Sequence, residues 1–258
     1  MMIKRFIIFF NFIIFAKKSL NTFISFLCTI HFHILLFLFQ KLQKRIIILK
    51  DFVVENDYDL FSDVTIADEP ETYKFIMQNI KKCKVFVDVG ANIGGYAIRA
   101  ARYCKVYAIE PLTRNYKILK INEKLNNVKI NSFNIAAGNK NGKIKLYYDP
   151  WNPALGSTKR EQKKSIEVEM KPLDEIINEE SIDLIKIDVE GAEDLVLEGA
   201  KNLLKRTKMV IIERSESLPK AYKILKKEGF RLIKILDKNN FVTNLVFIRS
   251  ATMDIYIL

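Results

Sequence analysis

The sequence of 258 residues contains little cysteine, glycine and proline, and each shortage excludes a class of protein. The three cysteines, Cys28, Cys83 and Cys104, are too few for a disulfide framework and show no C-x-x-C spacing, so we expect a reducing compartment. Nine glycines and six prolines exclude a collagen-like or low-complexity chain. Hydrophobic residues make up 49% of the chain, which excludes a disordered protein because such proteins lack the apolar surface that folding requires.

Acidic residues are absent from the first 50 positions, so the net charge of +12 is unevenly divided. Residues 1–50 contain eight of the 42 Lys and Arg residues, and residues 51–258 contain the other 34 together with all 30 acids, for a net charge of +4. A basic excess alone is compatible with nucleic acid, an anionic membrane or neither. Because the second part is only modestly basic and has no aromatic-basic stretch, we expect no nucleic-acid partner.

The same first 50 residues are the most apolar part of the chain. Residues 19–40 contain no charged residue, and this length suffices for a transmembrane helix, which needs about 20 apolar residues. Residues 6–16 are too short to span a bilayer alone and would lie along its interface or form part of a re-entrant segment. No small-residue cleavage site follows either run, which disfavours a cleaved signal peptide.

We therefore expect residues 1–50 to form a basic, membrane-associated segment and residues 51–258 to form a separate domain. Basic residues flank the span at 19–40 on both sides, so the positive-inside rule does not decide its orientation. Two alternatives stay open for this segment. It could be a helix buried against the domain, or the chain could have been assigned a start too far upstream.

From residue 51 onward, short apolar runs alternate with amphipathic stretches, which is typical of a mostly parallel α/β sheet covered on both faces. The first helix is expected to begin at Asp68-Glu69-Pro70-Glu71 and to run to about Lys81. A capping side chain, a proline in the first turn and acids near the N-terminus are all typical of a helix start. The end of the chain is expected to form an antiparallel hairpin. The predicted strands are 84–88, 105–110, 128–136, 182–188, 209–213, 231–236 and 241–248, and the later helices are 96–103, 115–125, 192–204 and 219–228. An insertion at 138–183 is expected at the carboxyl edge of the sheet, where substrate covers usually lie.

Three of the nine glycines, Gly90, Gly94 and Gly95, directly follow the predicted strand 84–88. Glycine here permits a sharp turn and a close approach of a ligand to the main chain. A dinucleotide site would have a glycine where Asn92 stands, and the carboxylate of Asp88 would repel a pyrophosphate. A cationic cofactor without phosphate, such as S-adenosylmethionine, suits that carboxylate better.

Glu110 strengthens this interpretation because it ends the second strand, 22 residues after Asp88. An acid at that place can accept hydrogen bonds from both hydroxyls of a ribose. The loop, the spacing and the acid together predict a site for S-adenosylmethionine.

Five segments in order resemble the FkbM-type methyltransferases of the seven-stranded, Rossmann-like methyltransferase superfamily. They are FVDVGANIGGYA, AIEP, NIAAGNKNGKIKLY, KPLDEI and IDLIKIDVEGAEDLVLEGA, within about residues 69–215. The resemblance implies methyl transfer from S-adenosylmethionine to an oxygen, often a hydroxyl of a sugar or a polyketide-like molecule. It implies cofactor-binding roles for Asp88, Gly90, Asn92 and Gly94 in the loop, Glu110 at the ribose, and Asn134 and Ala136 near the adenine. The family core does not require the apolar N-terminus.

Carboxylates at the ends of two later strands are the candidate catalytic groups. An alcohol is a weak nucleophile at neutral pH and gains from a base within hydrogen-bond reach. We expect Asp188 or Glu190 to accept the proton and the other to orient the hydroxyl, with Glu213 as a further candidate. Glu193 could join them or cap a helix. A divalent metal would need further oxygen ligands that the sequence does not place, so no metal site is predicted.

The leading hypothesis is a membrane-associated O-methyltransferase acting on a hydroxyl of a glycan or lipid-linked glycan. Its catalytic domain would lie in the cytoplasm, where S-adenosylmethionine is available. Three alternatives stay open: a methyltransferase acting on nucleic acid, one acting on a small soluble metabolite, and a non-enzymatic membrane protein that reuses the fold.

Overall fold

The structure is a computed structural model that describes residues 46–49, 52–55, 69–149, 152–157, 164–238 and 243–250. The chain divides into two compact units, Met1–Arg45 and Ile46–Leu258, and every element named below belongs to the second. The predicted membrane span at 19–40 lies outside the described residues. Within the described ranges, no helix is long and apolar enough to cross a membrane.

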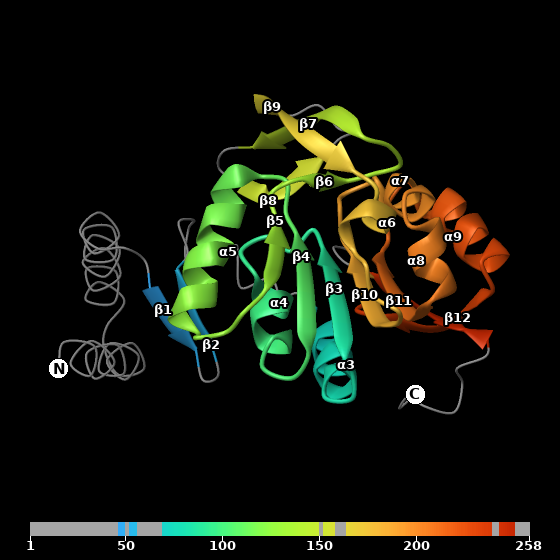
Figure 1. Cartoon of the computed structure of the whole chain (residues 1–258), viewed down its shortest axis with the longest axis horizontal. Helices are drawn as coiled ribbons and strands as arrows, with labels where there is room; N and C mark the ends of the chain where they lie inside the picture. The colour runs from blue at the N-terminus through green and yellow to red at the C-terminus, as the bar shows by residue number, and fades with distance from the viewer. Residues whose placement is uncertain are drawn as a thin grey trace, which may run out of the picture. The chain divides into compact units, whose positions relative to one another are not determined.

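Seven strands form the main sheet. They are β3 (Val85–Val89), β4 (Lys105–Ile109), β5 (Asn131–Phe133), β10 (Ile182–Ile187), β11 (Thr207–Glu213), β12 (Phe230–Leu236) and β13 (Asn244–Arg249). Their order is β12-β13-β11-β10-β3-β4-β5, and β13 runs antiparallel to both of its neighbours while the other adjacent pairs are parallel (Figure 1). This architecture confirms the predicted seven-stranded, mostly parallel α/β sheet with an antiparallel C-terminal hairpin.

Helices cover both faces of the main sheet (Figure 1). Those on one face are α3 (Pro70–Ile80), α4 (Gly95–Ala100) and α5 (Thr113–Leu125), and those on the other are α6 (Leu173–Ile176), α7 (Glu193–Glu198), α8 (Lys201–Lys205) and α9 (Leu218–Lys227). Alternate strand residues point to opposite faces, so Phe86 packs in the first core and Val87 in the second. Because both faces are covered, all residues of β3 and β10 are buried, which explains their continuous apolar runs.

The N-terminus of α3 is capped from a distant part of the chain. The carboxylate of Asp237, in the turn after β12, accepts the backbone N–H of Glu71 at 2.9 Å and that of Thr72 at 2.8 Å. The Glu71 side chain in return accepts the backbone N–H of Asp237 at 2.9 Å. The sequence predicts the early proline and the start of the helix correctly, but the N-cap position is Glu69, which makes no capping bond through its side chain.

Two predicted elements are each divided. The helix expected at 192–204 is interrupted between α7 and α8, where a Cβ atom on Gly199 would lie 1.8 Å from the carbonyl oxygen of Gly138. The strand expected at 128–136 is also two elements, because β5 ends at Phe133 and β6 (Ala136–Ala137) joins a different sheet. Contacts with distant segments set both divisions, and local sequence carries no signal of them.

The predicted insertion forms a small sheet with β6. Its other strands are β7 (Gly142–Asp149), β8 (Asn152–Ser157) and β9 (Lys164–Lys171), in the order β6-β9-β7-β8. The small sheet lies over the carboxyl ends of β3, β4 and β5 (Figure 1), and its core contains Leu146, Val168 and Met170. A separate antiparallel hairpin, β1 (Ile46–Leu49) and β2 (Phe52–Glu55), precedes the main sheet in the chain.

Candidate functional site

The glycine loop after β3 lies between the ends of β4 and β10. The backbone N–H groups of Gly90 and Ala91 both donate to the carbonyl oxygen of Ile109, at 2.9 and 3.0 Å. Gly90 has φ +84°, and a Cβ atom there would lie 1.7 Å from the carbonyl oxygen of Asp188. The end of β10 therefore already requires a glycine at this position, before any ligand is considered. Gly94, with φ +96°, precedes the first turn of α4.

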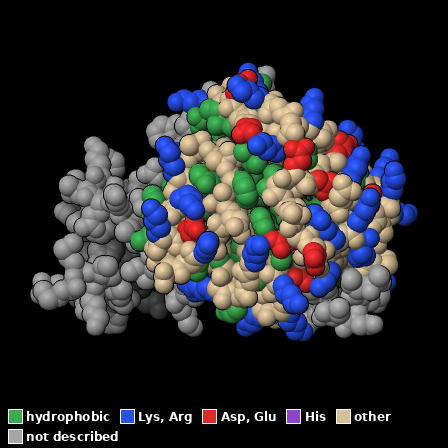
Figure 2. All heavy atoms as spheres, viewed as in Figure 1, with side chains coloured by type: hydrophobic (Ala, Val, Ile, Leu, Met, Phe, Trp, Pro, Cys, Tyr) green, Lys and Arg blue, Asp and Glu red, His purple; other side chains and the backbone are tan. Residues whose placement is uncertain are grey.

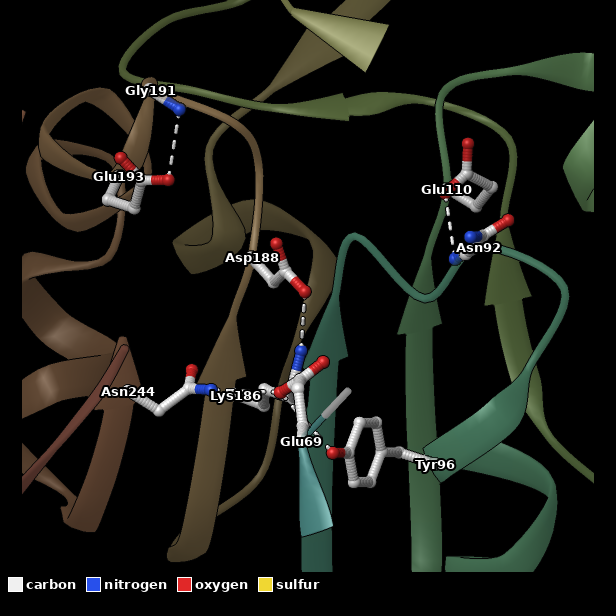
Figure 3. A network of polar contacts seen from close by, with 9 residues as sticks. All are labelled: Glu69, Asn92, Tyr96, Glu110, Lys186, Asp188, Gly191, Glu193 and Asn244. Atoms are coloured by element: carbon white, nitrogen blue, oxygen red, sulfur yellow. Dashed lines mark hydrogen bonds and ion pairs between the residues drawn. The ribbon is translucent and has the colours of Figure 1, made fainter. Parts of the chain in front are cut away.

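Glu110 is buried directly beside this loop. One of its carboxylate oxygens accepts the backbone N–H of Asn92 at 2.9 Å, and the other accepts that of Leu112 at 2.8 Å (Figure 3). Burial raises the pKa of Glu110 to about 7, although these two bonds oppose the shift. Each carboxylate oxygen has a second lone pair, so Glu110 can still accept hydrogen bonds from ribose hydroxyls.

Two loop acceptors have unused hydrogen-bonding capacity. The side-chain oxygen of Asn92, whose φ is +51°, is buried and has no hydrogen-bond partner among the described residues. Both carboxylate oxygens of Asp88 are buried without a well-formed hydrogen bond in this part of the chain, the Ala97 N–H being only a weak donor to them. Burial raises the pKa of Asp88 to about 7. Because buried acceptors are normally satisfied, these residues fit a cofactor that brings its own donor groups, such as the ammonium of S-adenosylmethionine.

Asn134 and Ala136 support the site from the other side. The amide nitrogen of Asn134 donates to the carbonyl oxygens of Glu110 and Pro111, at 2.9 and 3.0 Å, and its amide oxygen accepts the hydroxyl of Thr113 at 2.8 Å. Ala136 is buried in the core of the small sheet. Asn134 therefore holds the segment that carries Glu110, and the predicted place of both residues beside the adenine stays a prediction.

The three predicted catalytic carboxylates meet at the carboxyl edge of the main sheet. Asp188, Glu190 and Glu213 each offer an oxygen atom, and these atoms lie within 4.8 Å of one another. Glu213, the last residue of β11, is hydrogen-bonded to Asp188. Glu190 has φ +53° in the loop that follows β10. The structure therefore brings together the candidates that the sequence places at separate strand ends.

Lys186 makes the charges of Asp188 and Glu213 unequal. The sequence did not identify Lys186 as a functional residue. Its ammonium lies 2.7 Å from a carboxylate oxygen of Asp188, and its side chain is only 3% exposed (Figure 3). Burial would raise the pKa of Asp188, but Lys186 and the hydrogen bond from Glu213 hold it below the usual range. Burial and the Asp188 charge raise the pKa of Glu213 well above its usual range. These opposite shifts favour an ionised Asp188 and a protonated Glu213.

Glu193 has a structural role, but its carboxylate bonds two loops and makes no capping bond to α7. It is fully buried, and one carboxylate oxygen accepts the backbone N–H of Gly191 at 3.0 Å (Figure 3). The other oxygen accepts the hydroxyls of Ser215 and Ser217. These bonds join the loop after β10 to the loop after β11 and so fix the two strand ends that carry Asp188 and Glu213.

We assign no metal ion to the carboxylate cluster. Three carboxylates at this separation can in general hold a divalent cation, which prefers oxygen ligands. Here the buried ammonium of Lys186, 2.7 Å from Asp188, places a positive charge beside these oxygens, which disfavours a bound cation.

Comparison with known proteins decides the family. A family model described as the Methyltransferase FkbM domain matches residues 88–232, which include the glycine loop, Glu110 and all three catalytic candidates. The chain belongs to the FkbM methyltransferase family. As an FkbM methyltransferase, it uses S-adenosylmethionine as its cofactor.

Two curated methyltransferases resemble this FkbM methyltransferase at low identity. Hexuronic acid methyltransferase AglP of Haloferax volcanii is 24% identical over 165 residues, covering 63% of this chain and 69% of the relative. Methyltransferase sdnD of Sordaria araneosa is 26% identical over 199 residues, covering 60% of this chain and 77% of the relative. Among solved structures, an FkbM methyltransferase from Methylobacillus flagellatus is similar over 64% of this chain and 43% of its own, with 21% identity and a TM-score of 0.46.

Proposed function

We propose that this FkbM methyltransferase is an O-methyltransferase acting on a hydroxyl of a glycan or lipid-linked glycan. The observation that carries the proposal is the carboxylate of Asp188 at the carboxyl edge of the sheet, which lies 2.7 Å from the buried ammonium of Lys186 and within 4.8 Å of Glu190 and Glu213. The name of the Haloferax volcanii relative, a hexuronic acid methyltransferase, supports a glycan as the acceptor.

The chemistry of the carboxylate cluster favours oxygen over nitrogen as the methylated atom. S-adenosylmethionine, when bound, supplies an electrophilic methyl group on a sulfonium. A neutral amine already presents a lone pair, whereas a hydroxyl becomes a good nucleophile only as its proton leaves. Asp188 would take that proton while the oxygen–carbon bond forms and the methyl–sulfur bond breaks, the electron pair remaining on sulfur in a neutral thioether. The neighbouring Glu190 would accept a hydrogen bond that orients the acceptor.

The residues around the glycine loop would hold the cofactor. Glu110 would accept hydrogen bonds from the ribose of S-adenosylmethionine. The side-chain oxygens of Asp88 and Asn92 would accept hydrogen bonds from the positively charged part of the cofactor. Gly90 and Gly94 shape the turn that brings these groups together. The small sheet, which lies over this edge, would exclude water from the acceptor.

The surface of the domain also favours a glycan over a nucleic acid. Figure 2 shows Lys and Arg side chains mixed with Asp and Glu on the face that it draws, with hydrophobic side chains between them. Nucleic-acid-binding proteins typically present a contiguous basic surface instead.

The acceptor class is tested by transfer of label from S-adenosylmethionine carrying a tritiated methyl group. The full chain is incubated with p-nitrophenyl glycosides of glucuronic acid, galacturonic acid and neutral hexoses, with adenosine and a short RNA as comparison acceptors. We expect label on at least one glycoside and an oxygen-linked methyl group by mass spectrometry. Label confined to the adenosine or RNA would contradict the proposal.

We also propose that the enzyme works at a membrane, with its catalytic domain in the cytoplasm. The apolar, uncharged residues 19–40 of the sequence support this location. The full chain should pellet with membranes and resist carbonate extraction, and its recovery in the soluble fraction would contradict the proposal.

A further inference from the structure

We propose that Lys186 is a positioning residue that selects Asp188, rather than Glu213, as the group that takes the proton of the acceptor. The inference rests on the proposed function, because it concerns the base of the same O-methyl transfer. It extends that function by assigning separate roles to two carboxyl groups that lie close enough to compete for one proton.

The position of Lys186 follows from its place in β10. Residues two apart on a strand point to the same face, so Lys186 and Asp188 lie side by side. The ammonium lies 2.7 Å from the carboxylate of Asp188 and 4.9 Å from the centre of the Tyr96 ring, which provides a cation–π contact. Because the side chain is 3% exposed, water does not screen this charge as it would at the surface.

The charges around Lys186 do not balance if every acid is ionised. Glu69, Asp88, Asp188 and Glu213 all lie near enough to interact electrostatically with its ammonium, and Glu190 adds a further negative charge beside Glu213. One buried positive charge cannot compensate several buried negative charges, so most of these groups keep their protons. The ammonium is within ion-pair distance of Asp188 alone among these described acids.

Two neutral side chains near Lys186 form hydrogen bonds with Glu69. The side chain of Glu69 accepts hydrogen bonds from the amide nitrogen of Asn244, at 2.9 Å, and from the hydroxyl of Tyr96, at 3.4 Å (Figure 3). Burial raises the pKa of Glu69 and of Asp88, so both favour the protonated form more than free carboxyl groups do. Lys186 thereby favours the ionised form of Asp188 over the ionised forms of the other acids around it.

This distribution determines the path of the proton. When the hydroxyl loses its proton, the carboxylate of Asp188 becomes a carboxylic acid, and Glu213 stays protonated throughout. The side chain of Asp188 is 24% exposed, so it can return the proton to water after the product leaves. Without Lys186, Asp188 would bind a proton more readily, and the preference for Asp188 over Glu213 as the base would weaken.

The test is a carbon-13 NMR titration of the full chain labelled at the Asp and Glu carboxyl carbons. Asp188→Asn and Glu213→Gln assign the two resonances. In the wild-type protein, Asp188 should titrate below the usual Asp value of about 3.9, and Glu213 should stay protonated at neutral pH. In Lys186→Met, the midpoint of Asp188 should rise by about one to three pH units, the range expected for loss of an adjacent opposite charge.

Lys208→Met is the matched control. Lys208 pairs with the buried Asp183 at 2.6 Å, so this variant also loses a lysine–aspartate pair, but at the other end of β10. It should leave the Asp188 midpoint unchanged, whereas a general loss of structure would move the midpoint in both variants. If Lys186→Met does not fold, Lys186→Arg, which keeps the charge, should keep the low midpoint.

A wild-type Asp188 midpoint at or above the usual value, or a Glu213 that titrates before Asp188, would overturn the proposal. An unchanged midpoint in Lys186→Met would also overturn it. Calorimetric titration of S-adenosylmethionine into the wild-type chain is a separate readout. Absence of binding would contradict the proposed function, while the NMR result would still decide the role of Lys186.

Discussion

Gly90 couples the cofactor loop to the strand that carries the proposed base. Its backbone N–H donates to the end of β4, and its missing Cβ leaves room for the carbonyl oxygen of Asp188. Nearby side chains also have a structural and a proposed chemical role. Glu110 accepts the backbone N–H of Asn92 and so fixes the loop, and Lys186 pairs with Asp188. Single residues here therefore serve both the backbone geometry and the chemistry.

Replacing Gly90 with alanine should destabilise the protein by about 2–5 kcal/mol. The left-handed backbone costs about 1–2 kcal/mol, and overpacking against Asp188 adds about 1–3 kcal/mol. Gly229→Ala is the control, because its φ of +83° matches that of Gly90 (+84°), and its Cβ would approach nothing closer than 3.6 Å. The free energies of unfolding come from urea titration of the full chain, and equal losses in the two variants would contradict the account.

At the scale of elements, the ends of helices and strands are fixed by contacts across the fold. The best example is α3, whose first turn is capped by Asp237 across 166 residues of sequence. The turn after β12 thereby closes onto the start of the domain, and the hairpin at the C-terminal end supports the first helix.

Asp237→Ala should lower the free energy of unfolding by about 1–2 kcal/mol, the typical value for loss of a helix N-cap. Lys238→Ala changes the adjacent exposed residue in the same turn and should have little effect. Chemical denaturation of the two variants gives the comparison. A loss in Lys238→Ala as large as that in Asp237→Ala would show that the turn, and not the cap, is responsible.

Most elements of the main sheet could be predicted because each corresponds to a local pattern. The run at 182–188 predicts β10 and places Asp188 at its carboxyl end, and the glycines at 90 and 94 predict the loop. Elements set by distant contacts could not be predicted locally, as the break at Gly199 and the division after Phe133 illustrate.

The catalytic candidates could be predicted from their places at strand ends, but their charges could not. Lys186 is a lone basic residue in an apolar strand, and only the assembled sheet shows that it is buried against Asp188. A signal was present in the sequence, because the two residues are two apart on a strand and so share a face. What the sequence does not show is how many other acids surround that lysine.

At the scale of the whole molecule, the carboxyl edge of the sheet concentrates buried acids. Asp88, in β3, and Glu110, directly after β4, each have a pKa that burial raises to about 7. Such groups cost stability when they ionise without a partner. A protein without bound cofactor should therefore be sensitive to pH.

The free energy of unfolding of the cofactor-free chain should fall as pH rises from about 4 to about 7. Asp88 and Glu110 keep their protons in the folded state up to about pH 7 but lose them near pH 4 when unfolded. The folded state binds more protons between those values, so stability decreases with rising pH, by up to about 1.4 kcal/mol per pH unit for each group. Glu213, whose pKa is raised further, adds to this decline and extends it above pH 7. Asp188, whose pKa is lowered, contributes stability that is lost only at lower pH.

Thermal unfolding at a series of pH values measures this dependence. Asp88→Asn should make the decline shallower, and the double variant Asp88→Asn with Glu110→Gln should make it shallower still. Stability that rises between pH 4 and 7 to the same extent in all three proteins would contradict the assignment of protonated acids at this edge.

The most direct test of the account is the rate of methyl transfer by Asp188→Asn. This variant should transfer label from S-adenosylmethionine to the best glycoside acceptor about 10²–10⁴ times more slowly than wild type, the usual contribution of a general base. Its affinity for the cofactor should be nearly unchanged, and Glu180→Gln, an exposed carboxylate outside the cluster, should transfer label at the wild-type rate. An Asp188→Asn variant that is as fast as wild type would show that Asp188 does not accept the proton.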